Sequence, residues 1–352
     1  MKISEIPTNG ITFQTCEQAR PGLIKSCEVH PDIAEAVRLG KSEEGREIDA
    51  FFLGNGDTRI SLIAGAHSDE PVGPETLRLF VRYVLANKAS FTEFLQKHTF
   101  AIVPHINPDG EAKNRAWIAE WPSFDSYIRH AFREPPGRDL EFGFPDMRIE
   151  NRLVSEFLQH RGPFFLHMSL HGMGIADGAM LLIERHWIDR TGDLREKYQR
   201  HLIGAGLGLH DHDRKGDKGF QYIAPGFSTT PEGHAMREYF DSIGDAQTAA
   251  LFHNSSMEFV RSLGGEPLCL VTELPLFLIR KNVDSPPGVP GAYLEFKAAL
   301  PTLRRQAMQD ESLETERRQF QIEHVELETL IKYQLAAIEL GLEAISRNDR
   351  PS

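Results

Sequence analysis

The chain has 352 residues and a formal net charge of -12, with 40% hydrophobic and 26% charged residues. These proportions are typical of a globular protein and argue against a disordered or membrane-embedded chain. A strongly acidic balance also disfavours nucleic acid and anionic membrane surfaces as partners, because both require a basic face. No apolar run approaches the ~18 residues of a membrane helix, and the chain opens without the basic and apolar regions of a signal peptide, so we expect a cytoplasmic protein.

The length exceeds the usual size of a single hydrophobic core, although α/β folds often reach about 250 residues as one domain. We expect an N-terminal arm over residues 1–39 and a main domain over 40–285. A C-terminal helical extension over 286–352 is expected to pack on the same domain. The three cysteines are widely spaced and follow no zinc-finger or redox pattern, so no disulfide framework is predicted.

The first segment shows no clear hydrophobic period and predicts at most one short helix, over residues 32–39. Residues 40–56 alternate polar, glycine-containing turns with apolar flanks, which is typical of antiparallel edge strands. An apolar run over 59–66 then predicts a buried strand. That strand ends abruptly at His67, with Glu70 three residues later.

After this strand, two prolines and apolar residues at intervals of three and four predict a helix over 71–85 that covers the sheet. Another apolar run over 99–104 predicts a second strand, and the strand, helix, strand order favours parallel pairing. Residues 117–144 are rich in proline, glycine and aromatic side chains. They predict a long surface loop of functional importance.

Two later apolar runs also end in residues capable of catalysis or metal binding. The run over 164–170 leads to His171, and the run over 267–272 leads to Glu273. Sites in open α/β folds usually lie where the strands end, so one edge of the sheet could gather these groups from distant parts of the chain. A periodic stretch over 327–345 predicts a final helix.

The residues gathered at this edge are suited to zinc. A catalytic zinc site needs three protein ligands, commonly imidazole and carboxylate, and an open position for water. His67, Glu70 and His171 would supply the three ligands for one Zn²⁺ ion. Glu273 would remain as the general base of a metal-assisted hydrolysis.

Five motifs, in this order, resemble the zinc carboxypeptidase-type metallopeptidase family. They are Gly40-Lys41-Ser42 with Gly45-Arg46-Glu47-Ile48, His67-Ser68-Asp69-Glu70, Asn107-Pro108-Asp109-Gly110, Ser169-Leu170-His171 and Thr272-Glu273-Leu274. The match covers roughly Gly40 to Leu278 plus the final helix. The resemblance implies an α/β fold with a mixed, mostly parallel eight-stranded sheet flanked by helices, zinc on the same three ligands, and Glu273 as general base.

The resemblance also implies a role for Arg115, which follows the Asn-Pro-Asp-Gly turn. At this place the family has an arginine that polarises the scissile carbonyl and stabilises the oxyanion, a task for which a permanent charge and a planar fork are suited. The neighbouring Asn114 is a candidate substrate-binding residue.

One departure from the family pattern concerns the substrate's terminal carboxylate. The family usually carries Asp-Leu-Asn-Arg, of which the Asn-Arg pair binds that carboxylate, where this chain has Asp139-Leu140-Glu141-Phe142. Glu141 is expected to repel a carboxylate and Phe142 to form an apolar wall. Peptides with a free C-terminus are therefore expected to be poor substrates, unless Arg138 or Arg115 compensates.

We thus expect a zinc-dependent hydrolase of an amide (peptide-type) bond, acting on a peptide or an N-acyl amino acid. One alternative is a deacylase of small N-acyl amino acids, of the aspartoacylase or desuccinylase kind, which a small pocket closed by residues 117–144 would favour. Another is a catalytically silent zinc-binding protein of the same fold, against which the complete set of ligands and base argues. The C-terminal helical region is a candidate surface for a homo-oligomer.

Overall fold

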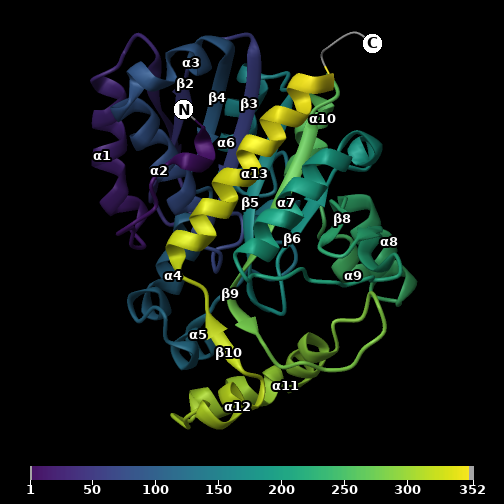
Figure 1. Ribbon diagram of the computed structural model, residues 1–352. Helices are drawn as coiled ribbons and strands as arrows, with labels where there is room; N and C mark the ends of the chain where they lie inside the picture. Colours follow the sequence, from purple (N-terminus) through teal and green to yellow (C-terminus); the bar gives the residue numbers. More distant parts are fainter. Residues whose placement is uncertain (1, 349–352) are drawn as a thin grey trace.

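The apolar runs of the chain form one mixed β-sheet in the computed structural model, which describes residues 2–348 (Figure 1). The strands are β1 (Ala34–Lys41), β2 (Glu47–Leu53), β3 (Thr58–Ala64), β4 (His98–Val103), β5 (Leu166–Ala176), β6 (Met180–Ile183), β7 (Tyr222–Ala224), β8 (Phe227–Thr229), β9 (Leu268–Ile279) and β10 (Ile322–His324).

The sheet is connected and covered by helices. The α-helices are α1 (Cys16–Glu28), α2 (Val72–Ala86), α3 (Thr92–Lys97), α4 (Pro108–Ala119), α5 (Phe124–His130), α6 (Ile149–Arg161), α7 (Gly192–Gly204), α8 (Gly233–Ser242), α9 (Ala246–Ala249), α10 (Ser256–Ser262), α11 (Gly291–Met308), α12 (Glu314–Gln319) and α13 (Leu327–Asn348). Short 3-10 helices are η1 (Ile3–Glu5), η2 (Lys88–Phe91), η3 (Leu140–Phe142), η4 (Arg185–Arg190) and η5 (Asp217–Gly219).

The strand order is β1-β2-β4-β3-β5-β9-β6-β8-β7, with β10 paired to β9. The central strands β4, β3, β5 and β9 are parallel to one another, as are β6 and β8, whereas the other described pairs are antiparallel. The predicted mixed sheet flanked by helices is confirmed. It has ten strands instead of the eight that the resemblance implies, and three of them, β7, β8 and β10, have only three residues each.

Helices cover both faces of the sheet. Helices α2 and α13 contact the central strands on one face, with α1 and α7 packed beside them, and α6 and α10 lie on the opposite face (Figure 1). Both sides of β3 are therefore buried. Leu62 packs in the core beneath α2 and α13, whereas its neighbour Ile63 packs with Val154 and Leu158 of α6. This double burial explains why β3 reads as a continuous apolar run rather than an alternating one.

Two local predictions were wrong. Residues 32–39 do not form a helix; most of them belong to β1, because the polar turn after Lys41 folds this stretch back onto β2 as an antiparallel hairpin. Residues 117–144 are not simply a surface loop, since they contain the end of α4, all of α5 and η3. Their aromatic residues are core residues: the rings of Trp117 and Tyr127 are both buried and meet edge to face at 5.0 Å.

The segments predicted as arm and extension are built into the sheet. Strand β1 crosses the boundary drawn at residue 39, and α13 packs against β5 and β9. Between β9 and α13, helices α11 and α12 lie below the end of β9 in the view of Figure 1. Within residues 2–348, no helix is both long and apolar enough to cross a membrane.

The buried Gln334 of α13 connects this last helix to the strands that carry the site. Its Nε2 donates to the backbone oxygen of His171 at 3.0 Å and to Thr272 Oγ1 at 3.3 Å, and its Oε1 accepts from Thr76 Oγ1 at 2.6 Å. We predict that Gln334→Leu lowers the free energy of unfolding by about 1–3 kcal/mol, because buried polar partners lose their hydrogen bonds. Urea unfolding measures this difference.

The matched control is Gln159→Leu on the exposed face of α6, where the same side-chain change meets solvent. The control should stay within about 0.5 kcal/mol of the parent protein. Equal stability of the two variants would contradict a structural role for Gln334.

Candidate active site

The loop after β3 and the middle of β5 bring the candidate ligands together. The two strands pair in parallel as far as Ala64 and Leu170, so the loop that leaves β3 starts next to His171. The prediction that strands end at His171 and Glu273 was wrong, because β5 continues to Ala176 and β9 continues to Ile279. Gly65 makes the turn out of β3 at a φ of +74°, and a Cβ at this position would lie 2.5 Å from the His105 ring. The turn lets the following loop bring His67 and Glu70 to His171.

His67, Glu70 and His171 offer ligand atoms that all lie within 4.8 Å of one another. His67 Nδ1 is 3.1 Å from Glu70 Oε1, and His171 Nδ1 is 2.8 Å from Glu70 Oε2. The two Nδ1 atoms are 3.0 Å apart. Two imidazole nitrogens and one carboxylate oxygen therefore converge, and this donor set is one that catalytic zinc uses.

Two carboxylates behind the histidines, the buried Glu141 and the partly buried Asp139, fix the orientation of both rings. His67 Nε2 donates to Asp139 Oδ2 at 3.2 Å, and His171 Nε2 donates to Glu141 Oε2 at 2.9 Å. With the protons on Nε2, both Nδ1 atoms keep their lone pairs for a metal. Hydrogen bonds of this kind orient ligating histidines in metal sites and increase their basicity.

The charges around the histidines favour a cation. Burial lowers the pKa of His171, yet Glu70 and Glu141 outweigh it and raise that pKa to about 9. Burial and the charge of Arg133 likewise lower the pKa of His67, but Glu70 and Asp139 raise it above its ordinary value. The site thus stabilises positive charge between the two rings. A divalent ion meets the same electrostatic requirement, so these residues fit zinc.

Glu273 lies opposite His171 in the pairing of β5 with β9. It lines the same cavity as Glu70 but is not among the three grouped ligands. Burial and then the negative charge of Glu70 raise the pKa of Glu273 to about 7. A carboxyl group that exchanges its proton near neutral pH is suited to general acid–base chemistry.

Arg133 is a site residue that the sequence did not indicate. Its Nε donates to Asp69 Oδ1 at 2.8 Å, its Nη2 pairs with Glu70 Oε1, and it lines the cavity that contains Glu273. Burial lowers the pKa of Arg133, but the two carboxylates raise it further, so the side chain stays charged. No local motif surrounds Arg133 in the sequence, and only the folded segment brings it to the ligands.

Asn114, predicted to bind substrate, instead holds the segment that carries Arg133. Its Nδ2 donates to the backbone oxygen of Phe132 at 2.9 Å, and its Oδ1 accepts from the Phe132 backbone N–H at 2.9 Å. Its side chain is fully buried and does not line the cavity. The geometry therefore gives Asn114 a positioning role.

The structure does not bring Arg115 or Arg138 to the ligand cluster. Arg115 follows the inward-facing Asn114 on α4 and points to the surface, where it pairs with Glu17 at 3.5 Å and lines a separate hollow. Arg138 is half exposed and pairs with Glu43. These positions correct the sequence-based placement of both arginines beside the substrate.

The expected positions of Glu141 and Phe142 also need correction. Glu141 is buried, and besides His171 it accepts hydrogen bonds from Ser169 Oγ at 2.9 Å and from the Ser256 backbone N–H at 3.1 Å. Phe142 packs against Phe252 in a core cluster. Neither residue lines the cavity, so Glu141 does not repel a substrate carboxylate. The short helix η3 directs the Glu141 side chain behind His171. No pattern in the sequence revealed this orientation.

Two of the five motifs that indicated the family have a structural role. Ser42 Oγ donates to Asp109 Oδ1 at 2.6 Å, and Arg46 Nη1 donates to the same oxygen at 2.8 Å. Asn107 caps the start of α4 by accepting from the Gly110 backbone N–H at 3.0 Å. These contacts join the hairpin of β1 and β2 to α4 and do not reach the ligands.

A cavity of about 310 Å³ opens beside the ligands. Its polar lining includes Glu70, Glu273 and Arg133, and its walls are formed by apolar side chains of β5, β6, α5 and α11. This size is at the lower end of the range for small-molecule sites, ~300–1,000 Å³. The cavity therefore suits one residue-sized group.

Comparisons with known proteins found similarity to zinc carboxypeptidases. A family model described as zinc carboxypeptidase matches residues 23–147. Carboxypeptidase B of Astacus astacus is 33% identical over 86 residues, which cover 24% of this chain and 28% of that protein. Carboxypeptidase D of Homo sapiens is 27% identical over 165 residues, covering 44% and 11% of the two chains. An inactive metallocarboxypeptidase, ecm14 of Talaromyces stipitatus, is 30% identical over 92 residues, covering 23% and 16%.

The chain thus spans less than a third of the length of each of these curated relatives. Among solved structures, a protein of Shewanella denitrificans OS217 classed as a metallopeptidase is 14% identical, covers 93% of this chain and 88% of its own, and has a TM-score of 0.53. Thrombin activatable fibrinolysis inhibitor is 11% identical, covers 98% and 82%, and has a TM-score of 0.51. At these identities the likeness shows the fold.

We predict that His171→Ala removes the metal from the protein, because one of three protein ligands is lost. Metal content by mass spectrometry of the purified variant should fall well below one zinc per chain. Full zinc stoichiometry in this variant would contradict the ligand assignment.

We predict that Glu141→Gln weakens zinc binding by about 10- to 100-fold, the usual effect of losing a partner behind a metal-binding histidine. Competition with a chromophoric chelator measures the affinity. The control is Glu43→Gln, which removes a carboxylate from a surface ion pair with Arg138. Unchanged zinc affinity in Glu141→Gln would show that the His171 contact does not support the metal.

Proposed function

Because this chain is related to the zinc carboxypeptidases, we propose that it is a zinc-dependent hydrolase of an amide (peptide-type) bond. The observation that carries this proposal is the convergence of His67, Glu70 and His171 beside a cavity that also contains Glu273. A ligand set without a base would suffice for storage or structure. A carboxyl group next to the ligands is what hydrolysis adds to that requirement.

In this proposal the three ligands hold one zinc ion, which when bound supplies Lewis acidity and lowers the pKa of water. Glu273 accepts the proton of the attacking water and later delivers it to the leaving amine. Apolar side chains form most of the walls of the cavity that Glu273 lines. Asp139 and Glu141 keep the imidazole rings fixed throughout the reaction.

Arg133 takes the role that the sequence assigned to Arg115. Its guanidinium pairs with Glu70 and lines the cavity, so a permanent cation lies next to the expected reaction centre. It would stabilise the negative charge that develops on the carbonyl oxygen. Because Asp69 also binds Arg133, the fork is held in place before the substrate arrives.

A deacylase of small N-acyl amino acids is the second candidate. The cavity of about 310 Å³ and its closure by α5, which belongs to the 117–144 segment, favour a small substrate. A panel of N-acyl amino acids assayed beside short peptides distinguishes the two. Faster turnover of the acyl amino acids would favour the deacylase.

The silent zinc-binding protein is the third candidate, and one of the relatives above is described as inactive. The presence of Glu273 inside the cavity argues against silence in this chain. Zinc binding without turnover of any peptide or N-acyl amino acid would support it.

We predict that Glu273→Gln retains zinc while turnover falls by at least about 100-fold, because the amide is nearly isosteric but cannot accept the proton. Zinc content and single-turnover kinetics are measured on the same preparation. Loss of zinc with retained activity would mean that Glu273 is a ligand and not the base.

We predict that Arg133→Gln lowers kcat by about 100-fold or more, the usual effect of removing an oxyanion donor, while zinc remains bound. Arg115→Gln is the control, because that arginine lies at the surface and pairs with Glu17. A larger loss of kcat in Arg115→Gln than in Arg133→Gln would restore the role assigned from the sequence.

A further inference from the structure

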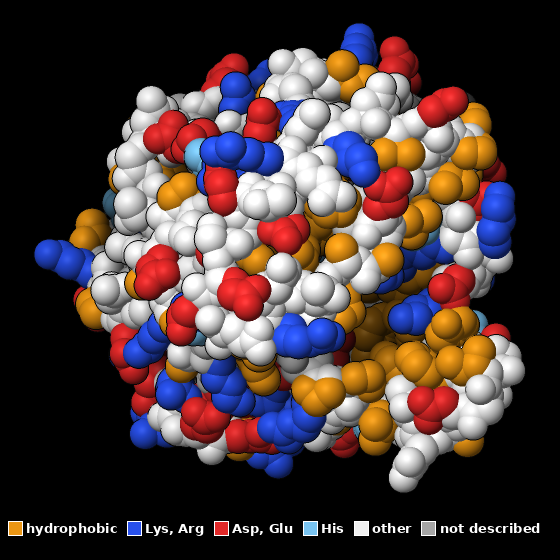
Figure 2. All heavy atoms as spheres, turned by 90° about the horizontal axis from the view of Figure 1, so that it is seen from below, with side chains coloured by type: hydrophobic (Ala, Val, Ile, Leu, Met, Phe, Trp, Pro, Cys, Tyr) orange, Lys and Arg blue, Asp and Glu red, His pale blue; other side chains and the backbone are white. Residues whose placement is uncertain are grey.

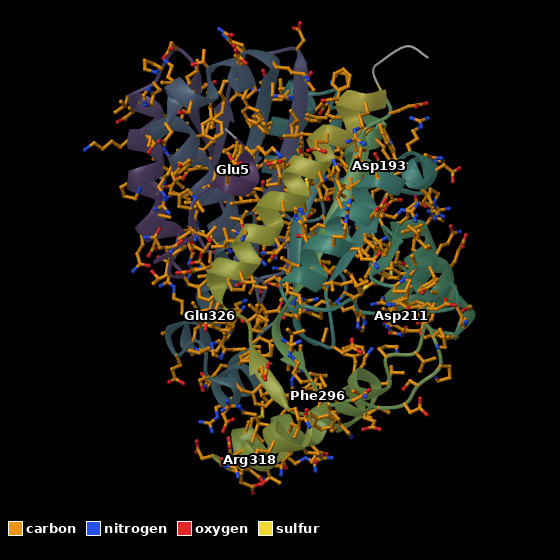
Figure 3. All side chains as sticks on the ribbon, viewed as in Figure 1. Glu5, Asp193, Asp211, Phe296, Arg318 and Glu326 are labelled. Carbon is orange, nitrogen blue, oxygen red and sulfur yellow. The ribbon has the colours of Figure 1, made fainter. Side chains whose placement is uncertain are left out.

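Helix α11 presents one face to the cavity beside the ligands. Five residues of α11 line the cavity: Tyr293, Phe296, Lys297, Leu300 and Arg304. Counted from Tyr293, the others follow after three, four, seven and eleven residues, which places all five on one face of the helix. Figure 3 shows Phe296 on this helix, below the end of β9. The helix lies outside residues 23–147, the part of the chain matched by the family model. A segment with no assigned role therefore forms a wall of the candidate active site.

Basic residues are concentrated in this cavity although the chain as a whole is acidic. Four cationic side chains line it, Arg133, Arg214, Lys297 and Arg304, against the three carboxylates of Asp69, Glu70 and Glu273. The net charge of the lining is thus +1 before any metal is added, in a chain with a net charge of -12. A cavity lining that is positive in a negatively charged protein favours a negatively charged ligand.

Three of these cations have no carboxylate partner. Arg133 pairs with Asp69 and Glu70, but within residues 2–348 no ion pair joins Arg214, Lys297 or Arg304 to an acidic side chain. Instead, Arg214 stacks on Phe220 at 4.1 Å, and Lys297 lies 6.0 Å from the Tyr293 ring. The rings hold these side chains at the cavity and leave their charges available.

The basic residues come from two separate segments that meet across the cavity. Lys297 and Arg304 belong to α11, whereas Arg214 belongs to the loop before η5. Arg214 and Lys297 both line the cavity, so their charges act on the same space. Figure 2 shows a hollow in this end of the molecule with apolar walls and basic side chains beside it.

We infer that Arg214, Lys297 and Arg304 determine substrate specificity, and that the residue entering this cavity carries an acidic side chain, glutamate or aspartate. The inference rests on the proposed hydrolase function. Mutual repulsion of three unpaired cations would disfavour their approach in the free protein. A substrate carboxylate offsets that repulsion, and the charge-assisted contacts with arginine add geometric selectivity. The apolar walls contact the aliphatic part of the same residue.

The test compares matched peptides that differ in one side chain. In the first pair, the C-terminal residue of the peptide is Glu or Gln. In the second pair, the residue on the N-terminal side of the scissile bond is Glu or Gln. We expect at least one pair to show a preference for Glu of about tenfold or more in kcat/KM, equivalent to about 1.4 kcal/mol. The preference should shrink as salt is raised, because the cations are partly exposed.

Arg304→Gln should reduce this preference at least threefold, and Arg304→Lys should restore part of it. The matched control is Arg305→Gln, which removes the same charge from the next residue of α11 but does not line the cavity. Zinc content should stay the same in all three variants, which shows that the zinc site is intact, and Arg305→Gln should also leave turnover of the Gln peptides unchanged. Equal use of Glu and Gln in both pairs would overturn the inference and leave hydrolysis standing.

Absence of turnover for every peptide would count against the hydrolase and not against acidic recognition. In that event, calorimetry with free glutamate and glutamine still decides the inference. Tighter binding of glutamate to the parent protein than to Arg304→Gln supports it, and equal affinities for glutamate and glutamine overturn it.

Discussion

The site depends on buried negative charge held directly behind two histidines. Asp139 and Glu141 lie two residues apart around η3, and each binds the Nε2 of one imidazole. Burying two carboxylates is costly unless every oxygen is satisfied. Here the Asp139 Oδ1 accepts from the Glu141 backbone N–H at 2.9 Å, and Glu141 accepts from Ser169 and Ser256. The rings are thereby fixed with both Nδ1 atoms directed to one point, which a metal can occupy.

This arrangement explains why so much of the chain serves the site without touching substrate. Ser256 at the start of α10 binds Glu141, and Gln334 of α13 binds the backbone of His171. Asn114 of α4 binds the backbone beside Arg133. Helices on both faces of the sheet therefore support the same edge, so the geometry of the ligands depends on the packing of the complete domain.

Electrostatics then divides the site into two parts. On one side of the ligands, buried acids favour a cation between His67 and His171. On the other side, the cavity that would receive substrate is lined by Arg133 and by three basic residues that have no acidic partner within residues 2–348. Metal affinity and substrate choice are thus controlled by different residues.

The sequence by itself determined the central strands, the covering helices α2 and α13, and the grouping of His67, Glu70, His171 and Glu273. These follow from local rules: a strand buried on both faces is a continuous apolar run, and parallel pairing of β5 with β3 and β9 sets His171 opposite Glu273 and next to the loop that leaves β3. The resemblance to zinc carboxypeptidases is supported by a family model over residues 23–147, which contain the first three of the five motifs. Two of these motifs, around Ser42 and Asp109, turned out to bind each other.

Only the tertiary structure decided which polar residues face the substrate. Glu141 looked like a substrate-facing charge and lies behind His171, whereas Arg115 looked catalytic and lies on the surface. The direction of a side chain in an irregular segment such as residues 131–148 depends on contacts with distant elements, and these leave no periodicity to detect. For the same reason Arg133 and the cavity face of α11 were invisible in the sequence: their neighbours in space, Glu70 and Glu273, are far from them along the chain.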